Sequence, residues 1–260
     1  MKVLPEAKRM LDKVIDIRRK IHAYPEPGFQ EFKTSETIKE YLETIGLAYK
    51  SGFGIAKTGV VAQLGNDKTK PTLALRADMD ALELLEETGA PYASTRPGYM
   101  HGCGHDAHTA MLLGTAEVLS QKELDSNVRF IFQPAEESVI TTEYAGGGAK
   151  PMVEAGVMEG VDAILALHVF TDQPTGKVTG WKNMASSSAD HFKIAIQGKG
   201  GHAAKPHAAK DAIVMAGQAI IALQNIASRF IDPLEPVVVT IGTIHGGTRH
   251  NIICDRVEMD

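Results

Sequence analysis

The sequence predicts an α/β fold in which a central mixed sheet is flanked by helices, followed by a smaller α+β domain. Three observations support this prediction. Strand patterns alternate with helical patterns as far as residue 167, the pattern changes near residue 176, and 43% of the 260 residues are hydrophobic, enough for a substantial core. We therefore expect a first domain at residues 1–177 and a second, smaller domain at residues 178–260.

Two helices are expected at the start of the first domain. Residues 6–22 carry apolar side chains at helical spacing, and the Pro and Gly residues at 25–28 end that helix. In the second helix, Thr34 can provide the N-cap and Gly46 follows the last turn. The alternation of strands and helices begins after Gly46.

The rest of the first domain alternates short apolar runs with a helical pattern. Strands are predicted at 59–64, 72–75 and 128–132, a long helix at about 106–121, and a short helix ending near residue 155. Residues 163–167 form a nearly continuous apolar run, which is typical of a strand covered on both faces. This order indicates a sheet with helices on both sides.

The second domain has a simpler predicted pattern. Residues 190–196 alternate as in a half-exposed strand, and residues 211–229 form a long amphipathic helix. Further strands are expected at 237–241 and 252–259. A small sheet with one helix-covered face accounts for this order.

Composition excludes some classes of partner. The formal charge of −5 includes no basic run, so neither nucleic acid nor an anionic membrane surface is expected as a partner. No stretch approaches 18 consecutive apolar residues, and the first 20 residues do not resemble a signal peptide. We therefore expect a cytoplasmic protein whose two cysteines are reduced thiols.

The segment HGCGHDAH at residues 101–108 is the strongest chemical signal. It places three histidines, one of the two cysteines and an aspartate within eight residues. Imidazole and thiolate together are suitable ligands for zinc. If carboxylates also bind the ion, manganese or cobalt are suitable as well. The alternative is a polar loop that caps the next helix.

Other polar residues follow three separate strands of the first domain. Asp78 and Asp80 follow the strand at 72–75, Glu136 and Glu137 follow the strand at 128–132, and His168 follows the run at 163–167. Ligands of open α/β sheets bind beyond the carboxyl ends of the strands, so these groups can share one crevice with the histidine-rich segment. Because neighbouring side chains point different ways, one glutamate can bind metal while the other acts on water.

Each of these residues also has a purely structural interpretation. The two glutamates can be a solvated acidic pair, and His168 can be a hydrogen-bonded histidine near the core. Asp78 and Asp80 can bond within a turn or to Arg76. In the second domain, the glycine-rich segment around His202 can be a simple turn, and Asn251 can be either a turn former or a substrate-binding group.

Taken in order, five motifs resemble those of a known family. They are RADMDAL at 76–82, HGCGHDAHT at 101–109, FQPAEE at 132–137, His168, and GKGGHAAKP at 198–206. Together they resemble the metal-dependent amidohydrolases of the aminoacylase and carboxypeptidase superfamily. The nearest branch is that of the hippurate hydrolases and auxin-conjugate (IAA-amino acid) hydrolases, and the likeness runs from residue 18 to residue 260.

The resemblance implies a role for each matching residue. The metal ligands would be Cys103, His105, Glu137 and His168, which hold divalent ions, two per subunit, of zinc, manganese or cobalt. Glu136 would be the general base for a metal-activated water, with Asp78 and Asp106 orienting the imidazoles. His202 would steady the oxyanion in the partner's active site, and Asn251 would lie near the substrate carboxylate.

The resemblance also implies an organisation and a reaction. Residues 1–177 would be the catalytic domain and residues 178–260 an inserted lid domain through which two copies form a homodimer. The reaction would be hydrolysis of the amide bond in N-acyl or N-aroyl amino acids or small peptides. The sequence leaves the acyl and amino acid specificity and the choice of metal open.

One departure from the family pattern concerns the C-terminal part. Family members continue beyond the point that matches Asp260 and supply a further histidine ligand, so the sequence shows four of the five expected ligands. If 260 residues is the native length, we expect an incomplete second metal site and weak hydrolysis. The alternative function is therefore a truncated, catalytically impaired, metal-binding homodimeric module.

Overall fold

The computed structural model describes residues 3–137, 139–140, 144–171, 173–180, 188 and 190–260. The chain divides into two compact units, Met1–Lys177 and Val178–Asp260, each of which is described by itself. The assignment of a catalytic and a lid role to these units stays a prediction.

The first unit contains a five-stranded mixed sheet in the order β1-β2-β4-β3-β7. Strand β3 is parallel to both β4 and β7, whereas β2 is antiparallel to β1 and β4. This confirms the predicted mixed sheet with flanking helices. Its elements are α1 (Pro5–Arg9), α2 (Leu11–His22), α3 (Phe32–Thr44), β1 (Tyr49–Phe53), β2 (Ala56–Leu64), β3 (Thr72–Asp78), α4 (His105–Ser120), β4 (Asn127–Gln133), β5 (Val139–Ile140), β6 (Ala145–Gly146), α5 (Ala149–Glu154) and β7 (Ala163–Ala166).

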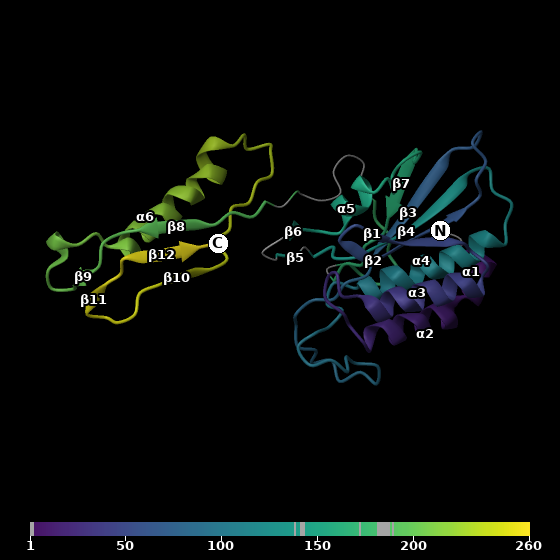
Figure 1. Cartoon of the computed structure of the whole chain (residues 1–260), viewed down its shortest axis with the longest axis horizontal. Coiled ribbons are helices and arrows are strands. Elements are labelled where there is room, and N and C mark those ends of the chain that lie inside the picture. The colour runs from purple at the N-terminus through teal and green to yellow at the C-terminus, as the bar shows by residue number, and fades with distance from the viewer. Residues whose placement is uncertain (1–2, 138, 141–143, 172, 181–187, 189) are drawn as a thin grey trace. The chain divides into compact units, whose positions relative to one another are not determined.

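Alternation along β4 divides the core between the two faces of the sheet. Phe130 and Phe132 point to the face covered by α3 and α4, where they pack with fully buried residues such as Leu42. Ile131 points to the opposite face and packs against Met152 of α5. Figure 1 shows α2, α3 and α4 gathered on one side of the sheet. Burial on both faces fixes the register of β4, because a shift of one residue would exchange its faces.

Two predictions about the N-terminal helices are wrong. The single helix expected at residues 6–22 is interrupted at Met10, which separates α1 from α2. Thr34 is not an N-cap but lies in the first turn of α3. Its backbone N–H and hydroxyl both donate to Glu26, at 2.9 and 3.0 Å, so a carboxylate from the preceding loop satisfies the free donors of this helix end.

Strand β7 is not covered on both faces, contrary to the prediction. All four of its residues are exposed, and among the described residues it pairs only with β3, so it is an edge strand. Leu165 and Leu167 line an apolar pocket that also includes Leu75 and Met111. A continuous apolar run therefore identified a strand here but did not establish its burial.

The second unit is a small antiparallel sheet with one helix packed on it. The strand order is β10-β12-β8, and a separate pair joins β9 to β11. Ala212 and Ala216 of the helix pack against Cys254, Val257 and Met259. Its elements are β8 (Ile194–Gln197), β9 (Gly201–His202), the 3-10 turn η1 (Pro206–Ala208), α6 (Ala212–Asn225), the π-helical turn η2 (Ile226–Phe230), β10 (Ile244–Gly246), β11 (Ile252–Ile253) and β12 (Arg256–Met259).

The strands of the second unit differ in extent from the predicted ones. No strand is assigned at residues 237–241, and Val238 is 88% exposed. The partner of β12 is instead Ile244–Gly246, a few residues further along. The strand expected at 190–196 is limited to the four residues of β8 that pair with β12. Pairing partners, and not apolar content, decide where these strands begin and end.

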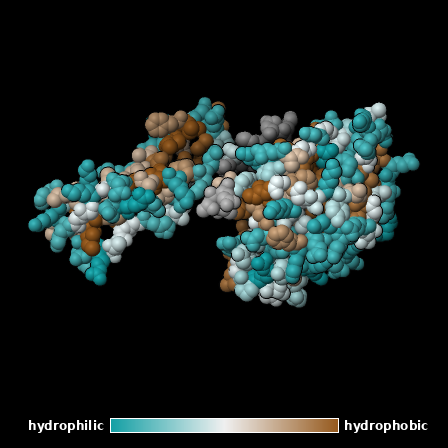
Figure 2. Space-filling model, viewed as in Figure 1, coloured by the Kyte–Doolittle hydropathy of each residue, from teal (hydrophilic) through white to brown (hydrophobic). Residues whose placement is uncertain are grey.

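Helix α6 leaves many apolar side chains exposed. Ile213, Val214 and Ile221 are at least half exposed, and Figure 2 shows the apolar patch on this part of the second unit. The helical segment Ala212–Phe230 is long and apolar enough to cross a membrane, by length and composition alone. One such helix is weak evidence, because core helices of soluble proteins meet the same criteria.

Candidate metal centre

The candidate site lies at the carboxyl ends of three neighbouring strands in the first unit. Asp78 ends β3, Glu136 and Glu137 follow the end of β4, and His168 lies two residues beyond β7. Because β3 is parallel to β4 and β7, these ends meet at one edge of the sheet. Helix α4 begins at the same edge with His105, as the sequence predicted.

The turn into α4 depends on a glycine. Gly104 has a φ of +85°, and a Cβ atom there would meet Cγ2 of Val169 at 2.3 Å. Glycine adopts this left-handed conformation without steric cost and leaves room for the segment after β7. The chain can therefore turn sharply between Cys103 and His105 and bring both side chains to the site.

His105 is the centre of the site. Its side chain is fully buried, and its Nδ1 lies 3.1 Å from Oδ1 of Asp80. Its Nε2 is buried without a hydrogen-bond partner, 3.8 Å from a carboxylate oxygen of Glu136 and 3.8 Å from one of Glu137. A carboxylate on Nδ1 favours the tautomer whose lone pair is on Nε2. A cation at that position would satisfy both this lone pair and the facing carboxylates.

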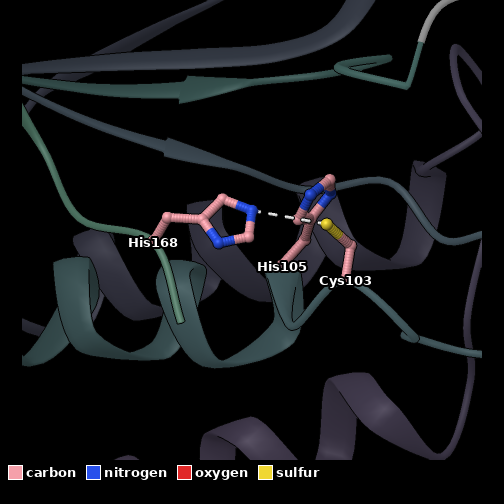
Figure 3. A group of neighbouring side chains, drawn as sticks. All are labelled: Cys103, His105 and His168. Carbon is pink, nitrogen blue, oxygen red and sulfur yellow. Dashed lines mark hydrogen bonds between the residues drawn. The ribbon is translucent and has the colours of Figure 1, made fainter. Parts of the chain in front are cut away.

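Cys103 and His168 face each other beside His105. The Sγ atom of Cys103 lies 3.3 Å from Nε2 of His168, and Figure 3 shows this contact next to the His105 ring. Nδ1 of His168 donates to the carbonyl of Val169 at 2.6 Å, so Nε2 keeps its lone pair. Ligand atoms of Cys103, His105 and His168 all lie within 4.8 Å of one another. This is the donor chemistry of a zinc, manganese or cobalt site once a carboxylate joins.

Glu136 and Glu137 also lie close to His105. One ligand atom each from His105, Glu136 and Glu137 also lie within 4.8 Å of one another. Therefore all four predicted metal ligands and the predicted general base gather around one imidazole. The residues present fit a divalent cation.

The charges of the site are unbalanced in the absence of a cation. Burial would lower the pKa of His105, but the hydrogen bond to Asp80 and the charge of Asp78 outweigh it and raise the pKa. Burial raises the pKa of the Cys103 thiol to about 12, with a further contribution from Glu137. Burial also raises the pKa of Glu136, although Arg76 opposes it. For Cys103 and Glu136 burial is the largest cause, whereas the shift of His105 reports the negative charge of the carboxylates around it.

The prediction that Asp78 and Asp106 orient the ligating imidazoles needs correction. Asp80, not Asp106, bonds His105, while Asp78 lies 2.6 Å from Nδ1 of His108. Asp106 points away from its neighbour His105, because consecutive residues of a helix differ in direction by about 100°. Its carboxylate bonds His22 at 2.7 Å instead.

His108 is a structural histidine and not an available ligand. Its Nδ1 bonds Asp78, and its Nε2 accepts from the backbone N–H of Val169 at 2.9 Å. Although Asp78, His105 and His108 are close enough to hold an ion, both nitrogens of His108 are already engaged. The role of His108 is therefore to hold the segment that carries His168.

Two buried groups near the site were not foreseen from the sequence. His22 is the last residue of α2, and its ring bridges Asp106 and Glu86. Glu31 is fully buried and accepts the backbone N–H of Ala135 at 2.8 Å. No local signal marks either residue, because their partners lie between 27 and 104 residues away.

The remaining two predicted site residues belong to the second unit. His202 and Asn251 are exposed, and the pairing of β9 with β11 brings their backbones together, with the Ala203 N–H donating to the carbonyl of Asn251. Nδ1 of His202 accepts from the Ala204 N–H at 3.1 Å, so the neutral ring carries its proton on Nε2. His202 is therefore available as a hydrogen-bond donor.

Comparison with known proteins gives a consistent set of relatives. The profile of peptidase family M20/M25/M40 matches residues 74–257. Thermostable carboxypeptidase 1 of Saccharolobus solfataricus is 43% identical over 260 residues, which cover 99% of the chain and 65% of that protein. An N-acyl-L-amino acid amidohydrolase of Geobacillus stearothermophilus is also 43% identical, with 98% of the chain and 68% of the relative covered. IAA-amino acid hydrolase ILR1-like 4 of Arabidopsis thaliana is 45% identical, with 98% and 57% covered.

Solved structures agree with these relatives. A Bacillus subtilis protein described as a dinuclear metal-binding peptidase of the M20 family superposes on this chain with a TM-score of 0.75 at 38% identity. The match covers 97% of the chain and 63% of that structure. An aminobenzoyl-glutamate utilization protein of Klebsiella pneumoniae superposes with a TM-score of 0.62 at 26% identity, with 97% and 67% covered. The chain therefore spans between 57% and 68% of the length of these proteins.

Proposed function

Because the chain belongs to peptidase family M20/M25/M40, we propose that it is a metal-dependent amidohydrolase of N-acyl or N-aroyl amino acids or small peptides. The relatives at 43–45% identity include a carboxypeptidase, an N-acyl amino acid amidohydrolase and an IAA-amino acid hydrolase. All three names describe cleavage of an amide bond next to an amino acid. The substrates of this chain are proposed at that level.

One observation carries the proposal: the unpartnered, buried Nε2 of His105 faces two carboxylates beside a thiol and a second imidazole. Leaving a buried polar atom without a partner is costly, and such atoms require a specific explanation. Cys103, His105, Glu137 and His168 would hold divalent metal, with two ions per subunit as in the Bacillus subtilis relative. Bound metal would supply Lewis-acid polarisation of the scissile carbonyl and a lowered pKa for water.

Glu136 would act as the general base. Its side chain is 40% exposed, so water and substrate can reach it, whereas His105 beside it is fully buried. Burial raises the pKa of Glu136, which moves its carboxylate toward the range where it can both accept and return a proton near neutral pH. It would take a proton from water during attack on the carbonyl and deliver it to the leaving amine.

His202 and Asn251 would contribute from the second unit. The Nε2–H of His202 is a suitable donor to the oxyanion of the tetrahedral intermediate in the active site of a partner subunit. The Asn251 amide would bond the substrate carboxylate. This assignment implies a homodimer that forms through the second unit acting as a lid. We also propose a reducing, cytoplasmic location, which is supported by the two free thiols of Cys103 and Cys254.

The proposal is tested with the purified chain, assayed on hippurate, N-acetyl amino acids and indole-acetyl amino acids with added Mn²⁺, Zn²⁺ or Co²⁺. We expect metal-dependent release of the free amino acid. Replacing Glu136 by Gln should abolish hydrolysis and leave metal binding intact, whereas Glu137→Gln should weaken metal binding itself. Hydrolysis by Glu136→Gln with metal still bound would show that another group is the base.

The same measurements test the alternative of a metal-binding homodimeric module without catalysis. That function requires bound metal, measured as ions per chain, and no release of amino acid from any of these substrates. Two ions per chain together with turnover would exclude it.

A further inference from the structure

Ala135 has an unusual backbone conformation next to the proposed catalytic glutamates. It lies in the turn of residues 134–137, here called the Glu136 turn, and has a φ of +48°. Left-handed backbone is rare for residues with a Cβ atom and persists only where the surroundings hold it. The direction in which Glu136 and Glu137 leave the end of β4 therefore depends on what holds this turn.

Two buried carboxylates hold the turn on either side of Glu136. The backbone N–H of Ala135 donates to Oε1 of Glu31 at 2.8 Å, and the N–H of Glu137 donates to Oδ2 of Asp80 at 3.0 Å. Hydrogen bonds to carboxylates are stronger than those between neutral groups. The second oxygen of Asp80 also bonds His105, so one of the two carboxylates joins the turn to a proposed ligand.

Glu31 is unusual for a buried acid. It has no exposed surface, and its second oxygen accepts from the hydroxyl of Thr58 at 2.6 Å. No ion pair of Glu31 with a Lys, Arg or His side chain is found among the described residues, and burial raises the pKa of Glu31 to about 7. Burying an acid without a cationic partner destabilises the fold, which calls for a compensating role.

The packing around Ala135 leaves the turn little freedom. The carbonyl of Ala135 accepts from the Gly148 N–H at 2.9 Å. A Cβ atom at Gly28 would meet Cβ of Ala135 at 2.9 Å, so the loop that carries Glu31 lies directly against the turn. The close approach of Gly28 and the hydrogen bond from Gly148 therefore restrict the same residue, Ala135, that has the left-handed backbone.

We propose that Glu31 is a positioning residue that holds Ala135 in its left-handed conformation and thereby aims Glu136 and Glu137 at the metal centre. This inference rests on the proposed function, in which these two residues are base and ligand. Glu31 itself touches neither substrate nor metal. Its carboxyl group acts through one backbone hydrogen bond.

The test compares four variants in the Mn²⁺-loaded chain. Glu31→Met keeps the volume and removes the acceptor, and Glu31→Gln keeps an acceptor for the Ala135 N–H. The matched control is Glu26→Met, because Glu26 is also buried in the same loop and accepts backbone N–H groups, but those of α3. The fourth variant combines Glu31→Met with Ala135→Gly, since glycine adopts a positive φ without help.

We expect Glu31→Met to lower both Mn²⁺ affinity and kcat by about tenfold or more, as is typical when a supporting shell is lost. Glu31→Gln should retain most activity, and Ala135→Gly should restore part of the loss in the Glu31→Met chain. Glu26→Met should change kcat much less than Glu31→Met does. Equal losses in Glu31→Met and Glu26→Met, with no recovery from Ala135→Gly, would overturn the proposal and leave a general role in stability.

A measurement without turnover separates this inference from the proposed function. Amide hydrogen exchange of Ala135 should be slow in the wild-type chain and faster in Glu31→Met. Fast exchange of the Ala135 amide in the wild type would refute the proposed role of Glu31 in holding this residue, even if Glu31→Met fails to fold. If the wild type hydrolyses none of the substrates, the proposed function fails, whereas Mn²⁺ titration and Ala135 exchange still decide the role of Glu31.

Discussion

Replacing Glu31 by glutamine should change how the stability of the first unit depends on pH. Burial raises the pKa of Glu31 from its ordinary value of 4.5 to about 7. Below pH 4.5 the carboxyl group is protonated in both the folded and the unfolded chain. Between pH 4.5 and 7 the unfolded chain releases this proton and the folded chain retains it, so the free energy of unfolding falls as pH rises.

The size of the effect follows from the same two values. One pKa unit corresponds to about 1.4 kcal/mol, so the change from 4.5 to about 7 corresponds to about 3 kcal/mol. Glu31 is fully buried, so solvent screening does not reduce this figure much. Glutamine has nearly the same shape as glutamate, and its amide does not titrate in this pH range. Relative to the wild type, Glu31→Gln should therefore gain about 3 kcal/mol between pH 4.5 and pH 8.

Urea unfolding followed by far-UV circular dichroism measures this difference. Both chains are unfolded at pH 4.5, 6, 7 and 8 with EDTA present, so that metal binding does not contribute. Every other titrating group is common to the two chains and cancels in the comparison. A difference in stability that stays constant over this range would refute the reasoning. A difference of opposite sign would mean that folding lowers the pKa of Glu31.

Three further predictions concern the metal centre and the Glu136 turn. Asp80→Asn should weaken Mn²⁺ binding by roughly 10- to 100-fold, because the amide cannot serve both the His105 ring and the backbone N–H that the carboxylate serves; unchanged affinity in calorimetry would contradict this. Gly148→Ala should destabilise the first unit by about 1–3 kcal/mol, because the added Cβ would meet the Pro134 carbonyl oxygen at 2.1 Å. An unchanged midpoint of urea unfolding would contradict this prediction. Cys103→Ser should bind Zn²⁺ with about one proton fewer released at pH 8, since the thiol, with a pKa of about 12, must lose its proton to bind metal. Calorimetry in buffers of different ionisation enthalpy measures that release.

Much of the candidate site was predictable because its signals are local. The strand patterns before Asp78 and Glu136, and the cluster around Cys103 and His105, each lie within a few residues. Parallel strands place their carboxyl ends at one edge, so the convergence of these groups with His168 follows from the shared direction of β3, β4 and β7. The structure brings these groups together as expected.

Other features depended on partners far away in the sequence. Asp80 and Asp78 are equivalent as sequence signals, and only the docking of α4 decides that the first bonds His105 and the second His108. The apolar run at β7 indicates a strand in either case, but whether it is central or at an edge depends on what packs beside it. A continuous apolar run reports that a segment can be buried and carries no information about which strands or helices lie beside it.

The sequence by itself determined the class of fold, because short-range spacing of apolar residues specifies secondary structure. Its motifs, through their resemblance to a family, supplied the four proposed metal ligands and the proposed base. Only the tertiary structure decided how those groups are held. The hydrogen bond from Ala135 to Glu31 spans 104 residues, and the positive φ that it supports has no signature in an alanine. Such contacts arise when loops and helices dock on a finished sheet, so their geometry depends on packing over the whole unit.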